Sequence, residues 1–121
     1  MANVVTTVGM RQALREAANV ASATPWYYMA VGTGSAPSPA ESSTALQTAV
    51  AGHAALTNSV SDNVATLEAF FTNSQGNGTL TEWGIFDSAL AMLMYGQFTP
   101  SVTKTSAQTL TVTVTVTLEN G

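Results

Sequence analysis

The chain carries very little charge, since only ten of its 121 residues, or 8%, are Asp, Glu, Lys or Arg. An average soluble domain has about 25%. Three cations and a net charge of −4 cannot neutralise several phosphates, which argues against a nucleic-acid-binding protein. A hydrophobic content of 45% argues against extended disorder, and the length predicts one domain over residues 1–121. Sparse charge with ordinary apolar content indicates that much of the surface faces another protein.

Cysteine is absent, and histidine occurs once, as His53. Disulfides and thiolate sites are therefore excluded, and we expect neither a metal, which would need several N, S or O ligands, nor a cofactor. The longest apolar run, Ala89–Tyr95, is far shorter than the roughly 20 residues that span a bilayer. Residues 1–10 lack the pattern of a signal peptide. We expect a product made in the cytoplasm, with no membrane partner.

Hydroxyl side chains fill the polar positions that charges usually take, with 19 Thr and 11 Ser. Near the N-terminus, Met10, Leu14, Ala17 and Ala21 lie on one stripe at helical spacing. This spacing predicts a helix over about residues 8–21, which Pro25 keeps from continuing.

The sequence after Pro25 is typical of short strands separated by turns, and predicts a β domain over about residues 26–119. A strand is expected at 26–31, and residues 45–51 fit a helical turn or a strand equally well. Two hairpins are expected, 54–61 with 64–71 and 80–86 with 89–98. The predicted fold is mainly β, an antiparallel β-sandwich of jelly-roll type with one N-terminal α-helix.

The last expected strand has the clearest pattern in the sequence. Apolar residues at positions 110–118 alternate with threonine at positions 109–117. A period of two built from β-branched residues predicts a strand with one dry and one polar face. Such a strand has no charge, proline or glycine to prevent pairing with other chains. We therefore expect it to be central in its sheet or paired at a subunit interface.

Catalytic patterns are weak, and we expect no enzymatic activity. Gly32-Thr33-Gly34 lacks the third glycine of a dinucleotide-binding turn, which favours a simple tight turn. His53 has Ser59, Ser61 and Asp62 nearby in sequence, but no nucleophile elbow surrounds either serine.

Three carboxylates offer the ingredients of a glycosidase pair: Glu68, Glu82 and Asp87. Glu82 and Asp87 fall on opposite faces of their strand by parity, so the two do not converge. We expect them to be solvated charges that discourage edge pairing.

Four aromatic residues offer an alternative function, a carbohydrate-binding module in which rings stack on a sugar: Trp26, Tyr27, Tyr28 and Trp83. Core packing is the ordinary role of such residues and is the expectation here.

Three segments, in this order, resemble small structural proteins of tailed-phage particles. Ala30-Val-Gly-Thr-Gly34, with Ala36-Pro-Ser-Pro-Ala and Thr44-Ala-Leu-Gln behind it, resembles their A-L/V-G-T-G … A-P … T-A-L opening. Gly78-Thr-Leu-Thr-Glu-Trp-Gly-Ile-Phe-Asp87 resembles their G-T-W-x-E-x-G-L-F-D stretch. Lys104-Thr-Ser-Ala-Gln-Thr-Leu-Thr-Val-Thr113 resembles their closing strand. With the helix before them, the order is similar to the N-terminal module of phage tail-collar fibre proteins.

The resemblance implies a non-enzymatic part of a virion, made in the host cytoplasm. The collar-fibre shaft, repeats and receptor-binding tip are missing from the sequence, so we expect a β domain that coats the particle. It would be a capsid decoration (cement) protein or a collar- or fibre-type component. Its partners would be further copies of itself, as a trimer, and other virion proteins such as the major capsid or collar protein.

The expected contact surfaces are the threonine strand and the loops 32–43 and 72–78. The candidate interface residues are Thr109, Thr111, Thr113, Thr115, Thr117, Gly32, Thr33, Gly34, Asn77 and Gly78. A threonine face without charge lets a neighbouring subunit approach without the desolvation of charged groups. The alternative is that the threonine face is exposed to solvent and contacts no partner.

Overall fold

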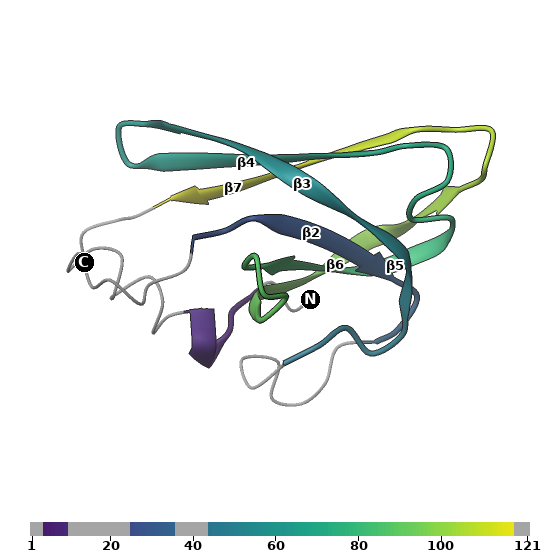
Figure 1. Ribbon diagram of the computed structural model, residues 1–121, viewed down its shortest axis with the longest axis horizontal. Coiled ribbons are helices and arrows are strands. Elements are labelled where there is room, and N and C mark those ends of the chain that lie inside the picture. The colour runs from purple at the N-terminus through teal and green to yellow at the C-terminus, as the bar shows by residue number, and fades with distance from the viewer. Residues whose placement is uncertain (1–3, 10–24, 36–43, 118–121) are drawn as a thin grey trace.

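A computed structural model describes residues 4–9, 25–35 and 44–117 (Figure 1). Its strands form one sheet in which all neighbours are antiparallel, in the order β1-β6-β5-β2-β3-β4-β7. The predicted mainly β, antiparallel fold is confirmed. The strands are β1 (Val4–Val5), β2 (Tyr28–Gly32), β3 (Ala49–Ser61), β4 (Val64–Phe71), β5 (Gly78–Phe86), β6 (Met92–Lys104) and β7 (Leu110–Thr117).

Residues 7–9 form a short helical turn. Most of the helix predicted for residues 8–21 lies outside the described residues. Within the part of the chain that the structure describes, no helix has the length and apolarity needed to cross a membrane.

The sheet folds over on itself because β3 contributes to both of its halves. Residues 49–55 of β3 pair with β2, and residues 56–61 pair with β4. In Figure 1, β3, β4 and β7 therefore lie along one side of the molecule, across from β2, β5 and β6. Gly52, in the first half of β3, has a φ of 94°, a backbone conformation that glycine adopts without strain.

The main core fills the space between the two halves of the sheet. In β4, Leu67, Ala69 and Phe71 are buried, whereas Glu68 and Phe70 between them are exposed, as the period of two requires. The buried apolar residues of this core are Met29, Val31, Ala54, Leu67, Ala69, Phe71, Leu80, Trp83, Ile85, Met94 and Val112.

A second buried cluster includes Phe86, Met92 and Tyr95, with Tyr28, Ala30 and Leu46 packed against it. The residues of β5 from Glu82 to Phe86 are all buried, although their side chains alternate in direction. The strand is therefore covered on both faces. Because β5 is covered on both faces, the carboxylate of Glu82 in this strand is buried.

Both predicted hairpins are present. The first turns at Asp62, whose φ is 53°. In the second, the outgoing strand starts at Met92 rather than at residue 89, because the Asp87 carboxylate accepts hydrogen bonds from the backbone N–H groups of Ala89 and Ala91, both at 2.9 Å. Of the ambiguous segment 45–51, residues 49–51 are the start of β3.

The threonine strand is β7, and its alternation is confirmed: Val112 is buried, while Thr111, Thr113, Thr115 and Thr117 are exposed. Of the two positions predicted for this strand, the central one is wrong. Among the described strands, β7 is the last in the sheet and pairs with β4 alone. The other expectation, a subunit interface, stays a prediction.

Candidate functional site

The threonine side of β7 continues across its neighbours as a broad surface of hydroxyl groups. The register places Thr113 beside Glu68 of β4, which in turn lies beside Thr57 of β3. The next rows on this side are Thr115–Thr66–Ser59 and Thr117–Val64–Ser61. We call this surface the hydroxyl face; its Ser and Thr residues are Thr57, Ser59, Ser61, Thr66, Thr111, Thr113, Thr115 and Thr117.

Glu68 is the only ionisable side chain in these rows, and it is exposed. Beside it along β4 lies Phe70, which is 53% exposed and adjacent to Thr111. The hydroxyl face is therefore polar, nearly uncharged and apolar at one margin. Such a surface can form many short-range contacts with a protein, while it offers no acid–base pair for catalysis.

The contribution of β3 and β4 to this face was not predicted from the sequence. The signal was present, because Thr57, Ser59 and Ser61 alternate as the β7 threonines do. Alternation alone does not show that three strands place their hydroxyl groups on the same side. Only the pairing register shows this.

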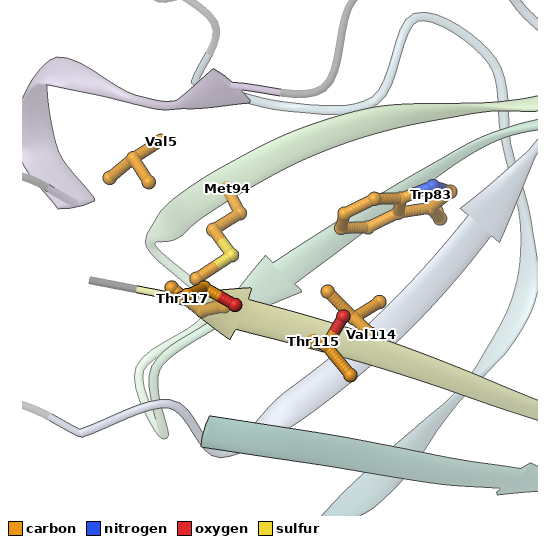
Figure 2. Close-up of a pocket in the computed structure, with 7 residues that line it drawn as sticks. Val5, Trp83, Met94, Val114, Thr115 and Thr117 are labelled. Carbon is orange, nitrogen blue, oxygen red and sulfur yellow. The ribbon is translucent and has the colours of Figure 1, made fainter. Parts of the chain in front are cut away.

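A groove of about 280 Å³ lies beside the free edge of β7 (Figure 2). Trp83 and Met94, from β5 and β6, project into it opposite Val114 of β7. Val5 lines the end near Thr117. None of the lining side chains is ionisable. The groove can accept apolar side chains, and the polar side chains among its lining residues are the hydroxyls of Thr115 and Thr117.

Glu82 is not the solvated charge that the sequence predicted. Its side chain is 0% exposed, because β5 is covered on both faces. The carboxylate accepts hydrogen bonds from the backbone N–H groups of Gly34 (3.1 Å), Gln47 (3.0 Å) and Thr48 (2.8 Å). It also accepts one from the hydroxyl of Tyr95 at 2.8 Å. Glu82 thus joins two loops to the sheet.

Asp87, which is 3% exposed, is likewise not solvated, and its carboxylate closes the β5–β6 turn. Glu68, by contrast, is exposed as predicted. The sequence could not separate these carboxylates, because strand parity predicts direction but not the loop that covers a face.

Burial raises the pKa of Tyr95 well above its usual value near 10, and the hydrogen bond to Glu82 and the negative charge of that carboxylate raise it further. The phenol consequently stays protonated at ordinary pH and remains a donor to Glu82. The Tyr95 hydroxyl and the Glu82 carboxylate are hydrogen-bonded to each other, and Glu82 is also bonded to the loops. Both side chains therefore have a structural role.

The Gly32-Thr33-Gly34 turn packs directly on Glu82. A Cβ at Gly34 would lie 2.8 Å from Glu82 Oε2, and a Cβ at Gly32 would collide with the same oxygen. The Thr81 hydroxyl donates to the Gly34 carbonyl at 2.7 Å. Gly32 is buried and Gly34 half-buried, so only Thr33 of these three candidate interface residues is exposed.

The candidate residues Asn77 and Gly78 are half-buried. The Asn77 amide accepts a hydrogen bond from the buried Lys104 Nζ at 2.7 Å and donates one to the Asn73 carbonyl at 3.0 Å. Gly78 has a φ of 141°, which suits glycine. This part of the 72–78 loop thereby holds the start of β5 against the end of β6.

The structure does not bring His53 together with Ser59 or Ser61, the residues that could have formed part of a catalytic triad. His53 lies in the first half of β3 with its ring 4.5 Å from that of Tyr28, centroid to centroid. Ser59 and Ser61 are six and eight residues further along the same extended strand, or roughly 20 Å and 26 Å away. Across the described ranges, no cluster of three or more His, Cys, Asp or Glu residues suitable for a metal is present.

Of the four aromatic residues, Trp83 is buried in the core, as expected, and Trp26 packs partly against it. Tyr27 is 46% exposed. Its ring meets that of Tyr28 at 68°, with 4.6 Å between centroids. The two rings are therefore edge to face and do not form a flat platform.

Comparisons of the chain with protein-family models, curated proteins and solved structures find no match. The hydroxyl face, the edge of β7 and the groove beside it are the features of the described residues that bear on function.

Proposed function

We propose that the protein is a non-enzymatic structural component of a tailed-phage virion, an oligomeric β domain that docks on the particle through its hydroxyl face. The observation that carries the proposal is this face: eight Ser and Thr side chains on three adjacent strands, with Glu68 as the only charge in their rows. A monomer kept soluble by its surface would carry many more charges there.

A second line of support comes from the residues of the phage-like segments. Gly34, Glu82, Asp87 and Lys104 all belong to contacts that hold loops to the sheet. These residues therefore have architectural roles in this chain, as we expect of a structural protein. The resemblance and the face together favour a capsid decoration protein or a collar- or fibre-type component, with the major capsid or collar protein as partner.

The carbohydrate-binding alternative has weaker support. It requires exposed rings that can stack on a sugar, whereas Trp83 is buried and the rings of Tyr27 and Tyr28 lie edge to face.

The test uses phage particles from which the gene has been deleted, with the purified protein added back. We expect the parent protein to co-sediment with these particles and to appear at regular positions in electron micrographs. Thr57→Lys with Ser59→Lys should weaken binding at least about tenfold, because each copy must then desolvate two charges at the contact.

The matched control is Ser88→Lys with Ser101→Lys, which adds the same charge at exposed positions outside the hydroxyl face. This control should bind as the parent does. Particles that take up no parent protein, or that bind the Thr57 and Ser59 variant as tightly as the control, would show the proposal to be wrong.

A further inference from the structure

We propose that β7 of one copy pairs antiparallel with β7 of a second copy across a two-fold axis, so that β3-β4-β7 of both copies form one continuous six-stranded sheet. The inference rests on the proposed function: the partner at the β7 edge of the hydroxyl face is a second copy of this chain. It is carried by the chemistry of the β7 edge, its symmetry, the surrounding charge and the groove beside it.

The sequence of the described edge, residues 110–117, has none of the residues that keep sheet edges apart. From Leu110 to Thr117 it contains no charge, no proline and no glycine. In an antiparallel ladder, every second residue of an edge strand points its N–H and C=O groups away from its one neighbour. For β7 that neighbour is β4, and no other described strand takes up these groups. A regular strand of eight residues with this composition is a template for another strand.

The sequence of β7 is complementary to itself. In antiparallel pairing, residues opposite each other point to the same side of the sheet. Threonine occupies the odd positions and Val or Leu the even ones, so a two-fold axis at Thr113 or Val114 places threonine opposite threonine and valine opposite valine. The hydroxyl face then continues across the axis without interruption.

The other edge of the sheet is a poor partner for β7. Among the described strands, this edge is β1 (Val4–Val5) beside Met94 and Tyr95, and β6 itself along the rest of its length. Pairing of β7 with this edge of another copy would be head-to-tail, and Pro100 in β6, which has no N–H group to donate, would interrupt it. Pairing of β7 with itself uses nearly its whole length. At this edge, the dimer is therefore favoured over the trimer that we expected.

Charge on the described residues does not oppose this pairing. Among them, the charged residue nearest to the edge on this side is Glu68, on the neighbouring strand β4. In the paired sheet, the two copies of β4 are three strand spacings apart, or about 14 Å. This separation exceeds the Debye length of about 8 Å at physiological salt, so repulsion between the two Glu68 carboxylates is screened.

The groove beside β7 accommodates the apolar side of the second strand. Val114 and Val116 line it from β7, and Trp83 and Met94 line it from the opposite layer. The valines of a paired β7 would extend the row that Val114 and Val116 begin, on the groove side of the sheet. Pairing would thus remove apolar surface from water in addition to forming main-chain hydrogen bonds.

Cross-linking tests the axis directly, because the native chain has no cysteine. Single cysteines are placed at 109, 111, 113, 115 and 117 and treated with a short thiol-specific cross-linker. Each residue of displacement from the axis adds about 6.8 Å to the distance between the two equivalent cysteines. Yield should therefore peak at Thr113→Cys, alone or with Thr115→Cys, and fall at Thr109→Cys and Thr117→Cys.

The matched control is Ser59→Cys, which is exposed on the same face but lies on β3. Its copies would be five strand spacings apart, about 24 Å, and should not cross-link. Equal yields at all positions, this control included, would mean random collisions and would overturn the inference.

Sedimentation gives the second measurement. The parent should sediment as a dimer, and Thr113→Lys with Thr115→Lys should weaken the dimer at least about tenfold, since four ammonium groups then crowd one axis. Thr57→Lys with Ser59→Lys should leave it unchanged. A parent that is monomeric, or trimeric without a peak at 113–115, would overturn the inference.

The two proposals fail in different ways. If the parent binds particles but shows no contact at β7, the pairing is wrong and the proposed function stands. If β7 dimers form but no particle takes up the protein, the proposed function is wrong.

Discussion

Among the single residues, Glu82 holds two loops against strand β5. Glu82 is a buried carboxylate that accepts four hydrogen bonds, from three backbone N–H groups and the Tyr95 hydroxyl. Hydrogen bonds to an ionised acceptor are stronger than neutral ones, and each buried donor that loses its acceptor is destabilising. The geometry therefore assigns Glu82 to the integrity of the loops 32–35 and 46–48.

We expect Glu82→Gln to lower the free energy of unfolding by about 2–4 kcal/mol, because the amide replaces one acceptor oxygen by an N–H₂ group that faces donors. Urea unfolding followed by circular dichroism measures this change. The control is Glu68→Gln, which removes the same charge from an exposed position and should change stability by less than about 0.5 kcal/mol. Equal effects of both substitutions would contradict the structural role of Glu82.

At the scale of elements, β3 and β7 have contrasting positions. β3 is bonded on both sides along parts of its length, to β2 and to β4, and so joins the two halves of the sheet. β7 is bonded along one side only among the described strands. An edge strand opens more easily than strands with two neighbours, and its amides exchange with solvent at a lower free energy.

We expect the amides of residues 110–117 to gain hydrogen-exchange protection as protein concentration rises. Pairing with a second copy gives hydrogen-bond acceptors to the N–H groups of β7 that point away from β4. The amides of β5, which lies between β2 and β6, should show no such dependence. Exchange followed by mass spectrometry at two concentrations, below and above the dimer dissociation constant, measures the difference. Concentration-independent exchange in β7 would count against pairing.

At the scale of the whole molecule, the period of two predicted the main strands and both hairpins, because alternation follows directly from strand geometry. The chain order of strands in the sheet could not be predicted. The sequence restricted β7 to a central or an interface position, and only the strand order of the sheet shows that β7 is at the edge of the described strands. Similarly, parity gave the direction of Glu82 but not its burial, which depends on loop residues such as Gln47 and Thr48.

The scarcity of charge predicts how self-association responds to salt. An interface made of Thr, Val and main-chain groups has no ion pairs to screen, so its dissociation constant should change by less than about threefold between 0.05 and 0.5 M NaCl. Analytical ultracentrifugation across this range checks the expectation. Thr113→Glu is the contrast, since its repelling carboxylates should make association recover with salt. A strong salt response of the parent would indicate a different, charged contact.

The way β3 runs through both halves of the sheet also has a mechanical consequence. Its first half is bonded to β2 and its second half to β4, so a pull on the β3-β4-β7 half reaches the β2-β5-β6 half along β3, as well as through the β4–β5 and β6–β7 connections. Hydrogen bonds in antiparallel ladders lie across the strands. Tension along β7 therefore loads the eight-residue ladder to β4 in shear, with its bonds sharing the force, whereas tension across β7 peels them apart one after another. The molecule should resist stretching along this axis far better than it resists lateral peeling, as a clamp does.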